Sequence, residues 1–249
     1  MPSDGEQRHG WRRGPVGVAA TVAVNDAVAV NDAVAEAVGQ TRRVDPVLPG
    51  TGGPAGNALL TAWTALVLLV ASVAELLTLF NVNALLSWHV AIGALLVPPA
   101  LMKTTSTAWR MARYYTGHPS YREAGPPPLL MRLLGPLVVV STLGLLGTGV
   151  LLVLRGQRQS HSRVFDAAGL RADWVTLHQA CFAVWAVATG LHLLGRLIPA
   201  LRITLQPDGS GRVPGAWSRW LVLAAMTASG VVLAVALVQA DASWLTAHR

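Results

Sequence analysis

The sequence predicts an all-α membrane protein with five transmembrane helices behind a low-complexity N-terminal tail. Of its 249 residues, 53% are apolar and only 12% are charged, whereas about 25% of the residues in an average soluble domain are charged. Charged residues are absent from 133–154, 174–195 and 220–240, and Glu75 is the only one in 46–102. A spanning helix needs roughly 20 apolar residues, so each stretch is long enough to cross a bilayer.

The tail covers 1–56, and the transmembrane helical domain covers 57–249. Within the tail, the six residues VNDAVA at 24–29 recur at 30–35. A period of six fits neither an α-helix nor a heptad repeat, so we expect a disordered segment. Polar residues such as Asn25 and Asp26 interrupt the apolar part of the tail, which argues against a cleaved signal peptide. The Pro- and Gly-rich stretch 46–56 is expected to be a flexible joint.

The five helices are expected at 57–80, 85–107, 130–154, 174–198 and 217–240. A tight turn at Asn81–Asn83 should connect the first two helices. The second helix should continue past the bilayer to Tyr115. Tryptophans lie near the ends of the apolar segments, as expected at the level of the lipid head groups. The second and fourth helices should run in the same direction, because one helix separates them.

Basic residues predict the orientation. The net charge of +7 comes from 18 arginines and the single lysine, Lys103, against 12 acidic residues. Eleven basic residues lie near helix ends on the side where the first helix starts, and five lie on the opposite side. The positive-inside rule therefore predicts a plasma-membrane protein with a cytoplasmic N-terminus and an external C-terminus.

The same distribution excludes several classes of function. The pI near 10.9 does not indicate nucleic-acid binding, because the arginines are spread between apolar segments. Cys181 is the only cysteine, which excludes an internal disulfide and a cysteine-based zinc or iron–sulfur site. The sequence has no P-loop, glycine-rich dinucleotide loop or nucleophile triad, and we assign no catalytic residue.

Three of the seven histidines, His89, His178 and His192, fall inside predicted membrane helices. An ionisable side chain there is costly, which makes each one a candidate functional residue. The other four histidines lie in tails or loops, where a solvated side chain is the simpler interpretation. They are His9, His118, His161 and His248.

The positions of the three membrane histidines favour a cofactor site. His178 and His192 are 14 residues apart, which places them on one helix face and about 21 Å apart along the axis. His89 and His178 each lie near the outer start of their helices, so they should face each other at one depth. Two neutral imidazoles from facing helices are a suitable pair of axial ligands for a haem iron. The alternative is that all three histidines only form hydrogen bonds within the bundle.

Four segments resemble bacterial transmembrane b-type cytochromes. This four-helix haem-binding superfamily includes the membrane subunits of nickel–iron hydrogenases and formate dehydrogenases. The resemblance covers about 57–200 and rests on histidine positions and helix order. The segments are LSWHVAIGALL (86–96), ARYYTGHPSYREAGPPPLLMRLLGP (112–136), TLHQACF (176–182) and GLHLLGRL (190–197).

The resemblance implies a haem-binding four-helix bundle plus one extra helix, with an outer haem b held by His89 and His178. It also implies electron transfer between a quinone pool and a redox partner subunit. The chain would then be at most an electron-transfer subunit of a membrane oxidoreductase. Two-haem members carry a second histidine on each ligating helix, but this chain has Lys103 at the position 14 residues after His89.

The ligand opposite His192 is therefore open, and so is a second haem. Lys103 could ligate iron as a neutral amine, extend to the head groups, or pair with a propionate or a quinone oxygen. Pro98 and Pro99 should kink the helix between His89 and Lys103, and His118 could fold back from its loop instead. Glu75 could orient His89 or carry protons, and Ser141, Gly144 and Thr148 form a small face that a flat macrocycle could approach.

Two other classes of function fit the same sequence. A small multi-span transporter could use Glu75 and the histidines as a proton path, and it would carry no coloured cofactor. A membrane anchor subunit would use the histidines only for packing. The sequence does not name the electron donor, the acceptor, the quinone or the oligomeric state.

Overall fold

The computed structural model describes residues 31, 34, 35, 45–124, 129–167, 170–205 and 213–240. In this part of the chain, five helices are long and apolar enough to cross a membrane. They are α2 (Gly53–Thr78), α3 (Leu86–Tyr115), α5 (Leu129–Ser160), α6 (Trp174–Leu205) and α7 (Ala216–Ala240). The shorter elements are η1 (Leu79–Asn81), α4 (Pro119–Glu123), β1 (Arg163–Ala167) and β2 (Leu170–Asp173).

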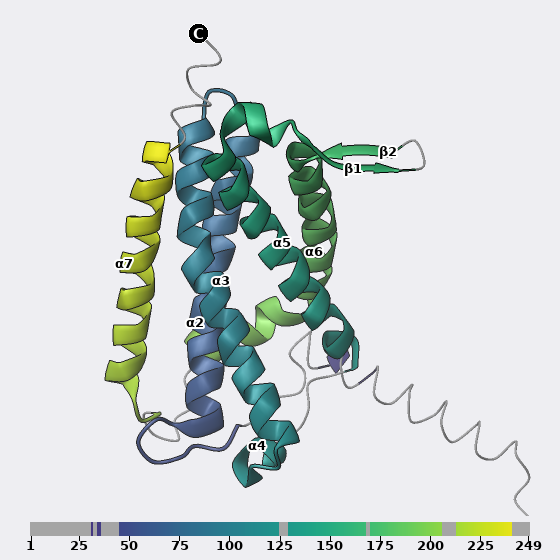
Figure 1. Ribbon diagram of the computed structural model, residues 1–249. Coiled ribbons are helices and arrows are strands. Elements are labelled where there is room, and N and C mark those ends of the chain that lie inside the picture. The colour runs from purple at the N-terminus through teal and green to yellow at the C-terminus, as the bar shows by residue number, and fades with distance from the viewer. Residues whose placement is uncertain are drawn as a thin grey trace, which may run out of the picture.

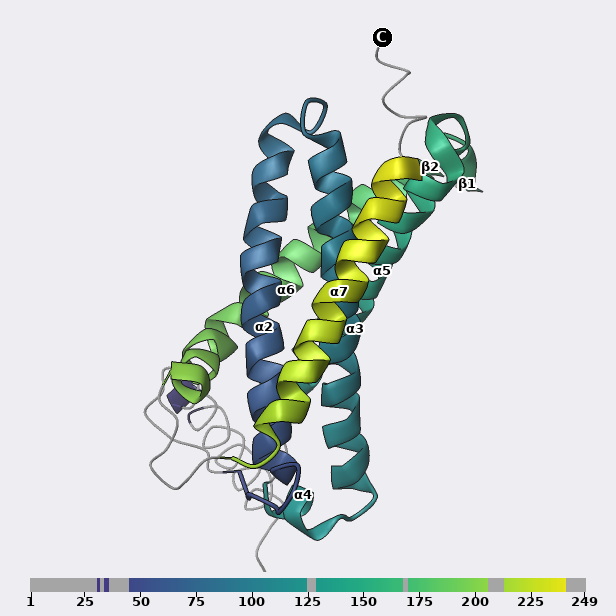
Figure 2. The same ribbon diagram turned by 90° about the vertical axis from the view of Figure 1, so that its left-hand side faces the viewer.

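The five long helices alternate in direction, so that α3 and α6 run the same way, as predicted (Figure 1). The main packed pairs are α2 with α3, α5 with α6, and α7 with α3. Helices α2, α3, α5 and α6 therefore form a four-helix group, and α7 lies against the outside of α3 (Figure 2). We call the end of the bundle that carries β1 and β2 the hairpin end, and the opposite end the α4 end.

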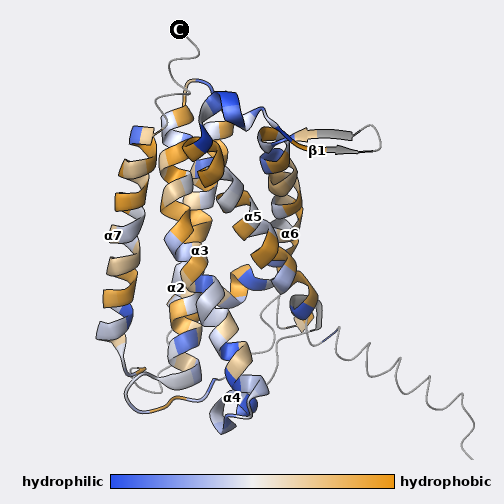
Figure 3. Ribbon diagram, in the orientation of Figure 1, coloured by the Kyte–Doolittle hydropathy of each residue, from blue (hydrophilic) through white to orange (hydrophobic). Residues whose placement is uncertain are grey.

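Apolar and polar side chains are distributed along the five long helices as expected for a bundle surrounded by lipid. Apolar residues cover the middle of each long helix, and hydrophilic residues gather toward the two ends (Figure 3). Large apolar side chains point outward, as Val70 (72% exposed), Leu194 (79%) and Val232 (69%) show. Small residues such as Ala94 and Ala188 are buried between the helices. This arrangement is typical of membrane bundles, in which close approach of small residues and not burial of large ones holds the helices together.

The predicted helices are confirmed, with differences at their ends. Helix α2 begins at Gly53, so the second part of the expected flexible joint at 46–56 is helical. Gly52 adopts the left-handed conformation (φ 80°), and Pro54 lies in the first turn, where a missing N–H has no helical cost. Helix α3 runs without a break through Pro98 and Pro99. The prediction of a disordered tail falls almost wholly outside the described residues.

The connection between α5 and α6 is more ordered than the sequence indicated. Helix α5 passes the predicted end at 154 and reaches Ser160 across a kink at Gly156, which has φ 71°. The Ser160 hydroxyl donates to the carbonyls of Leu152 and Gly156 at 3.3 and 2.8 Å and so closes this last turn. Strands β1 and β2 then pair antiparallel, with Arg163 opposite Asp173. The sequence predicts neither this extension nor the hairpin, because it places the helix ends at 154 and 174.

Candidate functional site

A cavity of about 1590 Å³ lies among α2, α3, α5 and α6. Ligand pockets commonly measure roughly 300–1,000 Å³, so this cavity has room for a large ligand or for more than one. Its lining extends from Asn83 and His161 at the hairpin end to Tyr114 and Arg202 at the α4 end. The four site residues predicted from the sequence all line it: His89, Lys103, His178 and His192. The proline pair in α3 therefore does not separate Lys103 from the face that carries His89.

At the hairpin end, His89 projects from the first turn of α3 toward the end of α2. Its Nδ1 lies 2.9 Å from the Thr78 hydroxyl and 3.1 Å from Oε1 of Glu75. The same hydroxyl donates to the Glu75 carbonyl at 2.6 Å. Because its only hydrogen is used in that bond, Thr78 must accept the proton on Nδ1 of His89.

His178 has a matching environment on the other side of the cavity. Its Nδ1 lies 2.9 Å from the hydroxyl of Thr148 on α5. Thr148 donates back to the Gly144 carbonyl at 2.7 Å, with the Leu145 carbonyl at 3.0 Å. Thr148 is therefore also placed to accept from Nδ1, and the hydrogen bonds favour the tautomer protonated on that nitrogen in both histidines.

The Nε2 atoms of His89 and His178 are consequently lone-pair donors, and no hydrogen bond from the described residues engages either of them. The two rings are close enough to interact electrostatically. Helices α3 and α6 are not among the closely packed pairs, so the rings lie on opposite walls of the cavity. A ring nitrogen with a free lone pair is the atom through which a neutral imidazole binds a metal ion.

Two glycines of α5 let side chains of α6 approach the α5 backbone closely. A Cβ at Gly149 would lie 3.2 Å from Cε1 of His178, and a Cβ at Gly144 would lie 3.3 Å from Sγ of Cys181. The His178 ring therefore lies close to the backbone of α5 at Gly149. Of the small face predicted at Ser141, Gly144 and Thr148, only Thr148 contacts His178, and Gly144 lies against Cys181.

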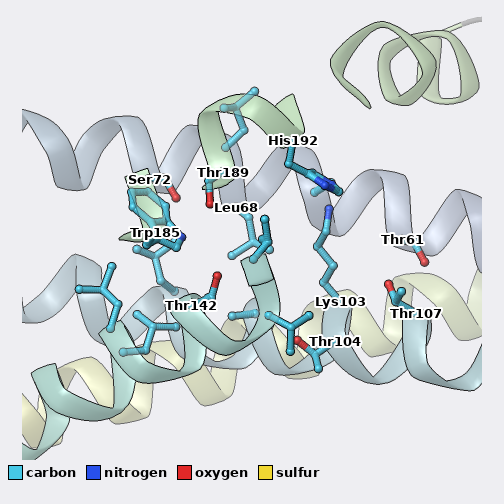
Figure 4. Close-up of a pocket in the computed structure, with 18 of the residues that line it drawn as sticks. Thr61, Leu68, Ser72, Lys103, Thr104, Thr107, Thr142, Trp185, Thr189 and His192 are labelled. Carbon is cyan, nitrogen blue, oxygen red and sulfur yellow. The ribbon is translucent and has the colours of Figure 1, made fainter. Parts of the chain in front are cut away.

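At the α4 end, a second polar group faces the cavity. Figure 4 shows the Lys103 side chain of α3 extending toward the His192 ring of α6. Lys103 and Arg196 are both close enough to His192 to interact with it electrostatically. In the described part of the chain, the buried Nδ1 of His192 and the buried hydroxyl of Thr189 have no hydrogen-bond partner.

The structure brings the predicted residues together as two pairs at two levels. His89 lies with His178, and Lys103 lies with His192. Sequence reasoning missed Thr78 as a partner of His89 and Thr148 as a partner of His178. It did consider Glu75 as an orienting group, and the carboxylate oxygen lies within reach of the ring. Hydroxyl residues are common in membrane helices, so no local signal marks these two.

Of the loop histidines in the described part of the chain, His161 is exposed, as expected for a solvated side chain, and His118 is not. His118 is half-buried and packs edge-on against Tyr121, with ring centroids 5.3 Å apart. His161 is exposed and contacts Asp173 at 3.0 Å. Hydrogen bonds from the backbone and hydroxyl of Thr176, followed by that from His161, lower the pKa of Asp173 from 3.8 to about 2.

Among the described residues, no group of three or more His, Cys, Asp or Glu side chains is placed to hold a bare metal ion. Two imidazoles fit a metal whose other ligands come with it, as the iron of a haem does. Three features suit such a group. Both rings are placed to donate from Nδ1, they lie on opposite walls of the cavity, and Gly149 has no side chain that would occupy the space beside His178. Neither family models, nor curated proteins, nor solved structures match this chain.

Proposed function

We propose that this protein is an integral membrane b-type cytochrome that carries electrons. The observation that supports this most directly is the pair of facing imidazoles. Each donates its Nδ1 proton to a threonine whose own hydrogen is used elsewhere, which leaves Nε2 free for iron. A packing histidine has no need for this tautomer on both walls of an apolar cavity.

In this proposal, His89 and His178 hold one haem b at the hairpin end. The bound haem supplies one-electron exchange at its iron. Thr78 and Thr148 fix the ring tautomers, and Glu75 adds a second acceptor to His89 alone. The two imidazoles therefore differ in basicity, and outer-shell groups tune a metal through the basicity of its ligands.

The proposed electron path is between a membrane quinone and a redox partner subunit. Its support is the resemblance of the four segments at 86–96, 112–136, 176–182 and 190–197, together with the absence from the sequence of any dinucleotide-binding motif. In the proposed orientation, the α4 end faces the cytoplasm, because more of the basic residues are found there.

The test is the reduced-minus-oxidised absorbance spectrum of the purified protein, with the ratio of haem to protein. The lone Cys181 cannot make the covalent attachment of a c-type cytochrome, so acid–acetone should extract the haem. His89→Ala and His178→Ala should each lose the same spectral component, and the double variant should lose no more. His192→Ala should retain that component, and His118→Ala serves as a matched control outside the cavity.

Protein expressed with ample haem supply and purified without any haem would contradict the proposal and favour a transporter or anchor. Loss of one band in His178→Ala and His192→Ala, with no effect of His89→Ala, would show that the ligand pairing is wrong even if haem is bound.

A further inference from the structure

Basic side chains outnumber acidic ones among the described residues that line the cavity. Six of these residues are basic, and two are acidic, Asp45 and Glu75. Both acids are engaged elsewhere. The Asp45 carboxylate accepts two hydrogen bonds from Arg110, at 2.7 and 3.1 Å, and Glu75 contacts His89. Among the described residues, no carboxylate lies within ion-pair distance of Lys103.

The groups near Lys103 also have unmet hydrogen-bonding capacity. Nδ1 of His192 and the hydroxyl of Thr189 are buried, and neither has a partner in the described structure. The Lys103 side chain points toward the His192 ring from the opposite wall, whereas the Thr189 hydroxyl lies to one side of them (Figure 4). Buried polar atoms and a buried ammonium are costly unless something pairs with them. An anion between Lys103 and His192 would pair with both of them.

The same cavity provides an apolar wall beside this polar group. Leu68 and Trp185 line it between the two levels, as Figure 4 shows. Trp185 is seven residues from both His178 and His192, so it lies midway between the levels along α6. A ligand that reaches Lys103 with a charged head can therefore place an apolar body against these side chains.

We propose that the α4 end of the cavity binds an amphiphile with a carboxylate head and an apolar body. Lys103 and His192 are the head-group ligands, and Arg196 adds positive charge nearby. This site is separate from the His89–His178 pair, because 14 residues of α3 span about 21 Å. It also differs from a second haem site, in which Lys103 would have to be a neutral amine that gives its lone pair to iron.

The sole lysine of the sequence makes this site directly measurable. The protein in nonionic detergent is treated with formaldehyde and a mild reductant, and mass spectrometry follows methylation of Lys103, with the N-terminal amine as internal control. Saturating oleate should slow methylation of Lys103 at least tenfold and leave the N-terminal amine unchanged. Oleyl alcohol, which has the same apolar body and no charge, should slow it less than twofold.

A second measurement uses variants and does not depend on labelling. Oleate should raise the Tm of the wild-type protein, and Lys103→Met should lose this rise while Lys103→Arg keeps part of it. Arg158→Met is the matched control, because it removes one positive charge from an exposed residue outside the cavity lining. It should retain the full rise.

Three results would overturn the proposal. Equal protection by oleate and oleyl alcohol, or by a neutral quinone analogue, would show that the carboxylate is not recognised. Protection by an anionic phospholipid but not by oleate would assign the site to a phosphate. Loss of a haem band in Lys103→Met would show that Lys103 ligates a second haem. If oleate protects Lys103 in a protein that binds no haem, the result supports the carboxylate site and contradicts the proposed electron transfer.

Discussion

Threonine hydroxyls control the chemistry of both hairpin-end histidines. A hydroxyl can donate one hydrogen and still accept another, so Thr78 and Thr148 satisfy a backbone carbonyl and an imidazole at once. In a bilayer this matters more than in water, because no solvent replaces a missing partner. A carboxylate in the same place would bring a charge into the apolar interior. The Glu75 carboxyl group also lies near His89, with Oε1 3.1 Å from Nδ1 of the ring.

The first prediction concerns Thr148→Val, which keeps the branched shape and removes the hydroxyl. His178 then loses the threonine acceptor and keeps the Leu145 carbonyl as a partner, so the tautomer that leaves Nε2 available is less firmly fixed. Replacing an outer-shell partner of this kind typically weakens metal binding by 10- to 100-fold, and for the proposed haem site we expect the affinity to fall by about that factor. Absorbance titration of haem-depleted protein measures it.

Thr204→Val is the matched control, because the Thr204 hydroxyl bonds only to carbonyls of its own helix, Ala200 and Leu201. It should bind haem as the wild type does. An unchanged affinity in Thr148→Val would mean that Thr148 does not set the tautomer of His178.

At the scale of the residue, the sequence was sufficient to select the histidines but not their partners. Their spacing along one helix follows from the helical repeat, and their depth follows from counting residues from the bilayer edge. Which threonine meets which ring depends on how neighbouring helices rotate about their axes. That rotation is decided by close contacts such as Gly149 against His178, and no pattern within one segment reports it.

The packing of α7 on α3 depends on a close approach of backbones. Gly230 of α7 is buried, and a Cβ there would lie 3.3 Å from Cδ2 and 3.4 Å from the carbonyl oxygen of Leu95. The second prediction is that Gly230→Leu forces α7 away from α3. Overpacking of this kind costs about 1–3 kcal/mol, which exceeds the roughly 0.5–1 kcal/mol gained by removing a helical glycine.

Thermal unfolding in detergent should therefore show a lower Tm for Gly230→Leu. Gly147→Leu is the control, because Gly147 is exposed in α5 and a Cβ there would meet nothing within 4 Å. It should be neutral or stabilising. If both variants unfold alike, the approach of α7 to α3 is not tight.

The start of α6 is fixed by a charged cap. Oδ1 of Asp173 accepts hydrogen bonds at 2.7 Å from both the backbone and the hydroxyl of Thr176. These bonds lower the pKa of Asp173 from 3.8 to about 2, so the carboxylate is favoured in the folded protein. The third prediction is that Asp173→Ala lowers the free energy of unfolding by about 1 kcal/mol at pH 7.

The pH dependence follows from the direction of the pKa shift. A depressed folded-state pKa contributes stability that is complete above the unfolded value and is lost as the pH falls. The difference between wild type and Asp173→Ala should therefore be constant above pH 5 and shrink between pH 4 and pH 2. Asp173→Ser, which keeps a cap and removes the charge, should lose most of this pH dependence. A gap that does not change with pH would contradict the role of the charge.

At the scale of the element, apolar length predicted the five helices, and the bilayer explains why. A segment of about 20 apolar residues must form a helix in lipid, so composition alone determines the element. Outside the bilayer this constraint ends, and the prediction loses accuracy there. The hairpin of β1 and β2 and the extension of α5 to Ser160 both depend on local hydrogen bonds in water, which the hydropathy pattern does not report.

Aromatic and basic side chains pair at both ends of the bundle. At the hairpin end, the Arg155 guanidinium lies 4.4 Å from the ring centroid of Trp174, and at the α4 end, Arg113 lies 4.7 Å from that of Trp109. Such pairs suit the head-group level, where a charge and a ring can both be accommodated. The two ends are thus alike in kind and differ in the number of basic residues.

The last prediction follows from that difference in number. Eleven basic residues near helix ends on one side against five on the other should place the α4 end in the cytoplasm and the hairpin end outside. Thr116 at the α4 end and Ser162 at the hairpin end are both exposed. In a Cys181→Ala background, a membrane-impermeant thiol reagent should label Ser162→Cys in intact cells and label Thr116→Cys only after the membrane is opened. Both variants should label equally in detergent, which controls for local accessibility. The inverse pattern in intact cells would show that the arginines at 155–171 outweigh the larger number at the other end, and it would place the His89–His178 pair on the cytoplasmic side.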